Sequence, residues 1–200
     1  MVDKVIFDTD GLVIQREMYF SARLSKDFGV APEKVLQFFK HEFKQCLIGK
    51  ADAKEELKKY AASWNWTGTI EQLLEYWFKS ESTIDQRIIQ TVQSLSAAGI
   101  HCYLDTNNER YRTEYLRQTL GLGKVFDAIF SSSLLGCAKP AVEFWQAIHK
   151  QLGEPDKATV MVWDDEKESV KSARGFGFQA ELYLGFGAFQ KVMQSRLGFA

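Results

Sequence analysis

Four aspartates stand out in this sequence because each pair follows an apolar run. Asp8 and Asp10 follow residues 5–7, and Asp164 and Asp165 follow residues 160–163. Close carboxylates oppose one another's ionisation unless a cation neutralises them. A hard divalent cation answers that need, and Mg²⁺ typically takes one or two carboxylates together with substrate phosphate and water. The aspartates therefore indicate a magnesium site that acts on a phosphate group.

The spacing of the first pair suits phosphoryl transfer. An aspartate such as Asp8 can attack phosphorus and form an aspartyl-phosphate. Asp10, two residues later, can protonate the leaving alkoxide and afterwards activate water. The hydroxyl of Thr106 and the ammonium of Lys139 offer a hydrogen bond and a positive charge to the transferring oxygens.

These residues must be positioned by a sheet. Short apolar runs predict strands, and helical periodicity predicts helices between them. Strands that alternate with helices predict a parallel sheet covered on both faces. Ligands of such sheets bind beyond the carboxyl ends of the strands, where the polar residues named above lie. The expected strands cover residues 5–7, 100–104, 126–130, 160–163 and 180–184, and the expected helices cover 109–120, 142–152 and 169–174.

A long helical stretch interrupts this alternation after the first strand. We expect four helices and no strand between about residues 15 and 98. Asp52 is expected to cap the third of these helices, with Glu55 reaching back to complete a capping box. The predicted fold is α/β, with a doubly wound, Rossmann-like parallel-sheet core over residues 1–14 and 86–200. Residues 15–85 are expected to form a smaller, all-helical cap domain.

Four segments in order resemble the motifs of the haloacid dehalogenase-like (HAD) superfamily of hydrolases. The first has apolar residues around Asp-x-Asp-Gly, the second an apolar strand ending in Thr-Asn, the third a lysine, and the fourth an acidic pair after a strand. The four segments are Val5-Ile6-Phe7-Asp8-Thr9-Asp10-Gly11-Leu12-Val13, Cys102-Tyr103-Leu104-Asp105-Thr106-Asn107, Gly136-Cys137-Ala138-Lys139-Pro140 and Val160-Met161-Val162-Trp163-Asp164-Asp165.

The resemblance implies a role for each matching residue. Asp8 would be the nucleophile, and Asp10 the general acid and base with its backbone carbonyl on the metal. Asp165 would bind the metal directly, with Asp164 close by, and the helical stretch would be a mobile cap over the site. The resemblance thus assigns catalysis to Asp8, Asp10, Thr106 and Lys139, substrate binding to Gly11, Thr106, Asn107 and Lys139, and Mg²⁺ binding to Asp8, Asp10, Asp164 and Asp165.

Two features lie outside the motif pattern. Asp105 is an unusual acidic neighbour of Thr106, and strand alternation should turn it away from that residue, so we expect a structural role against a helix. The cap carries four basic residues able to meet anionic substrate groups, and three tryptophans of which one is a candidate for the substrate pocket. These are Arg16, Arg23, Lys44 and Lys50, and Trp64, Trp66 and Trp77.

Composition narrows the class of partner. The net charge is −1, from 25 basic and 26 acidic residues, which is unlike the basic surface of a nucleic-acid binder. The three cysteines lack metal-ligand spacing and predict reduced thiols in a cytoplasmic protein. No apolar stretch has the length that crosses a bilayer. We therefore expect a small phosphorylated metabolite as partner, without nucleic acid or membrane; the oligomeric state is open.

The leading hypothesis is a magnesium-dependent phosphatase that hydrolyses a small phosphomonoester. A sugar-phosphate phosphomutase is the alternative, because the same core can return the phosphoryl group to the substrate. A haloacid dehalogenase is less favoured, since its chemistry needs neither Asp10 nor the metal nor the acidic pair. A non-catalytic binding protein is disfavoured by the presence of Asp8, Asp10 and Lys139 together.

Overall fold

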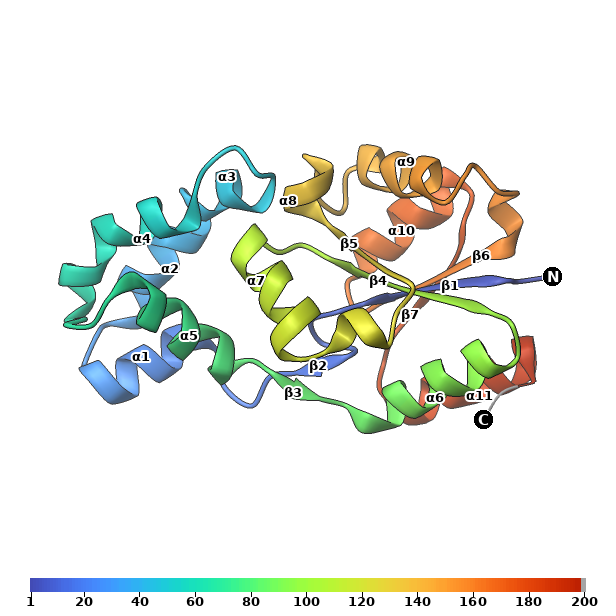
Figure 1. Ribbon diagram of the computed structural model, residues 1–200, viewed down its shortest axis with the longest axis horizontal. Helices are drawn as coiled ribbons and strands as arrows, with labels where there is room; N and C mark the ends of the chain where they lie inside the picture. The colour runs from blue at the N-terminus through green and yellow to red at the C-terminus, as the bar shows by residue number, and fades with distance from the viewer. Residues whose placement is uncertain (199–200) are drawn as a thin grey trace.

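The structure is a computed structural model that describes residues 1–198. Its centre is a five-stranded parallel sheet with the strand order β5-β4-β1-β6-β7 (Figure 1). The predicted α/β core is confirmed, and the first strand lies at the middle of the sheet. The strands are β1 (Lys4–Asp8), β4 (His101–Thr106), β5 (Ala128–Ser131), β6 (Val160–Asp164) and β7 (Gln179–Leu182).

Alternate residues of β1 pack into two apolar clusters, one on each face of the sheet. Val5 and Phe7 belong to the apolar cluster that includes α6 and α11, whereas Ile6 belongs to the cluster that includes α9 and α10. This is the period of two that a strand buried on both faces requires. Figure 1 shows α6 and α11 on one side of the sheet and α9 and α10 on the other. These helices are α6 (Gln86–Ala97), α9 (Val142–Gln151), α10 (Lys167–Phe176) and α11 (Phe186–Leu197).

Helix α11 was not predicted from the sequence. It begins after Gly185 and contains Gly187, and glycine is a poor helix former, so local preference argues against it. Tertiary packing decides instead. Phe189 and Met193 are buried against the sheet, and the Phe189 ring lies 4.7 Å from that of Trp163 on β6.

Short helical segments complete the core and carry its loops. Helix α7 continues directly into a π-helical turn, and α8 follows β5 without a loop. The segments are α7 (Arg110–Glu114), the π-helical turn Tyr115–Thr119, α8 (Ser132–Leu135), and the 3₁₀ turns Leu122–Lys124 and Lys157–Thr159.

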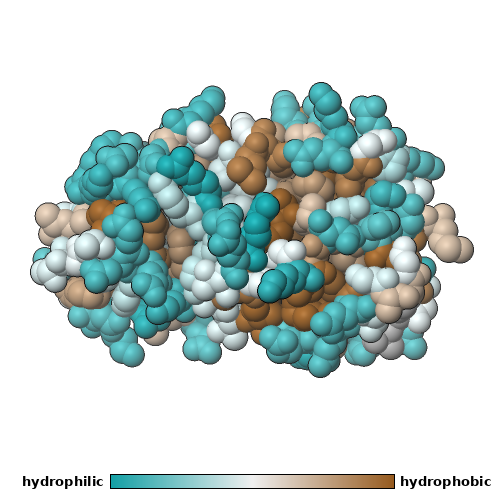
Figure 2. All heavy atoms as spheres, in the orientation of Figure 1, coloured by the Kyte–Doolittle hydropathy of each residue, from teal (hydrophilic) through white to brown (hydrophobic). Residues whose placement is uncertain are grey.

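The helices inserted after β1 form a cap with an apolar cluster of its own (Figure 1). Aromatic rings dominate this cluster, and Trp64 and Phe38 are fully buried in it. On the face seen in Figure 2, hydrophilic side chains cover much of the core and of the cap, and hydrophobic residues show in patches between these side chains. The cap comprises α1 (Phe20–Phe28), α2 (Pro32–Lys40), α3 (Phe43–Leu47), α4 (Ala53–Ala61), the 3₁₀ turn Ala62–Trp64 and α5 (Ile70–Ser80).

The capping prediction was half right. Asp52 does cap α4, accepting hydrogen bonds from the backbone N–H groups of Lys54 and Glu55. The Glu55 carboxylate turns outward and accepts from Lys58 instead. The capping box of the cap lies at the start of α5, where Thr69 and Gln72 exchange hydrogen bonds.

A two-stranded ribbon joins cap and core, and the expectation of no strand between residues 15 and 98 was wrong. β2 (Ile14–Gln15) pairs antiparallel with β3 (Thr83–Ile84). Strands of two residues have too few positions to display a period, so the pattern could not reveal them. We propose this ribbon as the boundary between core and cap. Across residues 1–198, none of the helices has the length and apolar character to span a bilayer.

Replacing the buried Leu57 of α4 with alanine tests the packing of the apolar cluster in the cap. Leu57 has no exposed surface, so Leu57→Ala should lower the free energy of unfolding by about 2 to 5 kcal/mol. Urea denaturation followed by circular dichroism measures this loss. The neighbouring Lys58→Ala, which alters an exposed side chain, should stay within about 0.5 kcal/mol of wild type. Equal losses in the two variants would contradict the packing described.

Candidate active site

The carboxyl edge of the sheet holds one lysine among three aspartates. The Nζ atom of Lys139 donates to Asp8 at the end of β1, Asp105 on β4 and Asp164 at the end of β6, each at 2.7 Å. All four side chains are buried. Burial alone would lower the pKa of Lys139, but the three carboxylates raise it well above its usual value. Lys139 is therefore a fixed positive charge at this edge.

Asn107 holds the loop that presents Lys139. Its side-chain amide donates to the Lys139 backbone carbonyl and accepts from the Lys139 backbone N–H, both at 2.9 Å. This reciprocal pair joins the loop after β4 to the loop after α8. Asn107 thus fixes the lysine backbone, and it also lines the pocket at the site.

Asp105 lies inside the site, so the expectation of a structural role against a helix was wrong. Strand alternation turns Asp105 away from Thr106, as expected, but on that side it meets Lys139 rather than a helix. β1 and β4 run parallel with Asp8 opposite Asp105, so the two carboxylates face the same side of the sheet. There Asp105 contacts Lys139. Burial, reinforced by the charge of Asp164, raises the pKa of Asp105 to about 6.

The arrangement fits a divalent cation. Asp8, Asp164 and Asp165 each offer a ligand atom, and these atoms lie within 4.8 Å of one another. When ionised, the three carboxylates around Lys139 exceed its charge by two. Burial raises the pKa of Asp8 well above its usual value even though Lys139 opposes the shift. One hard divalent cation would balance this charge and keep Asp8 ionised.

Gly11 makes room for one of these ligands. Its φ is +95°, a conformation that side chains rarely adopt. A Cβ atom at this position would lie 1.9 Å from Oδ2 of Asp165. Gly11 thus lets the turn after β1 approach the acidic pair after β6.

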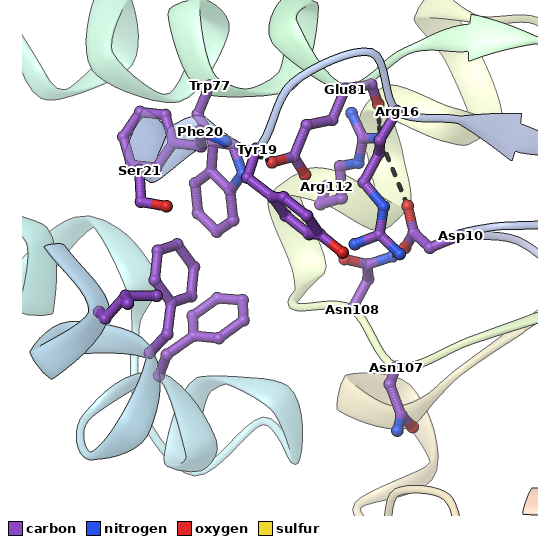
Figure 3. Close-up of a pocket in the computed structure, with 13 residues that line it drawn as sticks. Asp10, Arg16, Tyr19, Phe20, Ser21, Trp77, Glu81, Asn107, Asn108 and Arg112 are labelled. Carbon is purple, nitrogen blue, oxygen red and sulfur yellow. Dashed lines mark hydrogen bonds and ion pairs between the residues drawn. The ribbon is translucent and has the colours of Figure 1, made fainter. Parts of the chain in front are cut away.

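Asp10 is held by residues that the sequence analysis did not single out. The Nδ2 atom of Asn108 donates to Oδ2 of Asp10 at 2.9 Å and also to the hydroxyl of Thr106. The guanidinium of Arg112 on α7 lies 4.0 Å from Oδ1 of Asp10. Arg112 also donates to the backbone carbonyls of Phe78 and Glu81 in the cap. Asp10 is thus connected to the core through Asn108 and, through Arg112, to the cap (Figure 3).

The pocket at the site has a volume of about 160 Å³ and brings most of the predicted residues together. Thr106 is not among its lining residues; it has no exposed surface, and its hydroxyl accepts from Asn108. Gly11 stands beside Asp165 rather than in the lining. Of the four cap cations considered, only Arg16 lines this pocket. Its lining residues are Asp8, Asp10, Arg16, Asn107, Lys139, Asp164, Asp165 and Glu166.

Glu109 caps α7, the helix that follows β4. Its carboxylate accepts from the backbone N–H groups of Tyr111 and Arg112. Glu109 is 1% exposed, and burial raises its pKa to about 7 although these hydrogen bonds oppose the shift.

A sequence comparison with protein families matches residues 2–177 to the haloacid dehalogenase-like hydrolases. A sesquiterpene phosphatase of Aspergillus oryzae is 32% identical over 93 residues, which are 46% of this chain and 47% of that protein. The chain therefore matches about half the length of this curated relative.

Solved structures share the fold. A HAD family enzyme from Bacteroides thetaiotaomicron, in complex with magnesium and inorganic phosphate, superposes with a TM-score of 0.77 at 17% identity, over 91% of this chain and 94% of that one. An L-2-haloacid dehalogenase from Xanthobacter autotrophicus superposes with a TM-score of 0.65 at 18% identity, over 98% and 84%. At such identities these likenesses establish the architecture of core and cap.

Gly11→Ala should weaken Mg²⁺ binding at least tenfold, because the new Cβ must displace Asp165. Isothermal titration calorimetry with MgCl₂ measures the dissociation constant. Gly175→Ala is the matched control, since Gly175 lies in α10 with open space around its Cβ position. Unchanged Mg²⁺ affinity in Gly11→Ala would remove Asp165 from the proposed ligand set.

Glu109 should make stability depend on pH. Between its ordinary pKa of 4.5 and about 7, the folded protein retains a proton that the unfolded chain has released. The free energy of unfolding of wild type should therefore fall relative to Glu109→Gln as pH rises through this window, by about 3 kcal/mol in total. Urea denaturation across the window measures it. Glu114→Gln should follow the wild-type curve, and a parallel curve for Glu109→Gln would refute the assignment.

Proposed function

The chain belongs to the haloacid dehalogenase-like hydrolase family, and on that basis we propose that it is a magnesium-dependent phosphatase acting on a small phosphomonoester through an aspartyl-phosphate on Asp8. The observation that carries this proposal is the contact of Lys139 with Asp8 in the lining of a pocket that Asp10 also lines. Together they place a nucleophile, a fixed positive charge and a proton-transfer group around one small volume.

In the proposed reaction a carboxylate oxygen of Asp8 bonds to phosphorus while the bond from phosphorus to the ester oxygen breaks. Asp10 gives its proton to the departing alkoxide and then takes a proton from water, which attacks phosphorus and releases inorganic phosphate from Asp8. Lys139 stabilises the charge on the transferring oxygens. Mg²⁺, held by Asp8, Asp164 and Asp165 with the Asp10 backbone as a further candidate ligand, would neutralise the charge between nucleophile and phosphate.

Asp10 favours a phosphatase over a dehalogenase. A halide leaves without a proton, whereas an alkoxide needs one. Two side chains hold Asp10 in position, since Asn108 donates to it and Arg112 lies beside it. The phosphatase among the relatives, and the neighbour that binds magnesium and phosphate, support the same assignment. We further propose that Thr106 and Asn107 support the phosphate site, Thr106 through the hydrogen bond that its hydroxyl accepts from Asn108.

Phosphate release in the presence of Mg²⁺ tests the proposal. Asp8→Asn should lower kcat more than about a thousandfold, because the nucleophile is lost. Asp10→Asn should lower it about a hundredfold to ten thousandfold, the usual contribution of a general acid and base. Chelation with EDTA should abolish turnover, and added MgCl₂ should restore it.

Asp127→Asn is the matched control, since Asp127 lies near the start of β4 and pairs with His101, far along the sheet from the site. It should retain wild-type kcat. Full activity in Asp8→Asn would refute the mechanism. Chloride release from a 2-chloroacid without phosphatase activity would identify a dehalogenase instead.

A further inference from the structure

A second cavity, of about 260 Å³, adjoins the phosphate pocket beneath the cap. The two share Asp10, Arg16 and Asn107 as lining residues. Asp10 thus stands where the pockets meet, and it is the residue proposed to protonate the leaving oxygen. An ester whose phosphorus lies beside Asp8 would therefore extend its alcohol part into the second cavity.

The far end of this cavity is apolar. Trp77 of α5 stacks on Phe20 of α1 with ring centroids 5.3 Å apart, and it also contacts Phe39 of α2 and Phe43 of α3. Leu36 of α2 completes the apolar lining and is 39% exposed. In Figure 3, Phe20 and Trp77 lie across the cavity from Asp10. Four cap helices therefore contribute an apolar wall opposite the general acid.

Two charged groups of the lining, Glu81 and Arg112, already have hydrogen-bond partners, and the guanidinium carbon of a third, Arg16, lies 5.2 Å from the centroid of the Tyr19 ring. Glu81 accepts a hydrogen bond from the backbone N–H of Phe20 at 2.7 Å. Arg112 donates to two backbone carbonyls and lies near Asp10. A sugar or another polyol entering this cavity would bury hydroxyl groups against aromatic rings, which costs free energy unless each hydroxyl is hydrogen-bonded. An apolar group avoids this cost and gains the free energy of burial.

The cavity volume indicates the approximate size of the group that it holds. Apolar cavities of about 150 Å³ accommodate benzene. In proportion, about 260 Å³ suits roughly ten carbon atoms. Resting on the phosphatase function proposed above, we infer that the substrate is the phosphomonoester of a compact apolar alcohol, held between Phe20, Phe39 and Trp77 with its ester oxygen beside Asp10.

Three substrates separate this inference from the function on which it rests. We compare 2-phenylethyl phosphate with glycerol 3-phosphate, because both carry a primary alkyl leaving group and differ mainly in polarity. Acetyl phosphate reports on the phosphoryl-transfer machinery without needing the second cavity. We expect kcat/KM for 2-phenylethyl phosphate to exceed that for glycerol 3-phosphate at least tenfold.

Turnover of acetyl phosphate without this preference overturns the inference and leaves the phosphatase standing. Failure to hydrolyse all three substrates overturns the proposed function, and the inference with it. These outcomes use the wild-type protein, so they do not depend on the folding of a variant.

A variant of the cavity wall locates the preference. Leu36→Asp places a charge in the apolar lining at a partly exposed position that tolerates substitution. It should lower the ratio of kcat/KM for 2-phenylethyl phosphate to that for glycerol 3-phosphate at least threefold. Leu134→Asp makes the same change on α8, at a residue that is 62% exposed and lines neither cavity, and should leave the ratio unchanged. Equal ratios in Leu36→Asp and wild type would place the preference elsewhere.

Discussion

The ammonium of Lys139 among the carboxylates of Asp8, Asp105 and Asp164 is the interaction on which the site depends. Three neighbouring strands, β4, β1 and β6, each contribute one carboxylate, so the cluster ties the carboxyl edge of the sheet together. A buried ion cluster of this kind gives little net stability, because desolvation offsets attraction. Instead, the cluster fixes the positions of its side chains. Because the three carboxylates exceed the charge of the one lysine, the cluster carries a negative charge that a divalent cation would balance.

One side chain of the core links the cap to the site. Arg112 lies on a core helix, yet it donates to backbone carbonyls at the end of α5 and beyond it, and it approaches Asp10. Asp10, the proposed general acid, therefore lies beside the arginine that donates to the cap backbone. In the proposed reaction, exclusion of water by the cap and a correctly placed proton donor would both assist turnover, and Arg112 contacts the groups responsible for each.

The sequence predicted the parallel core and the strand-end aspartates because burial of a strand and the position of its polar end are local features. It could not predict how side chains meet. Asp105 was misjudged because its contact with Lys139 depends on the register between β1 and β4 and on the loop after α8. Asn108 was missed because an amide following a recognised motif carries no pattern of its own. Likewise, α11 forms through tertiary packing at Phe189 and Met193, against the local preference of its glycines.

The ribbon of β2 and β3 has a topological consequence. Because Gln15 pairs with Thr83, the insertion leaves and re-enters the core at adjacent points. Its apolar cluster is separate from those of the sheet. The connections between the strands of the sheet therefore do not depend on the segment inserted between Gln15 and Thr83. Such an arrangement would let the strand-end residues of the proposed phosphatase stay in place while the inserted helices, and the surface they enclose, change.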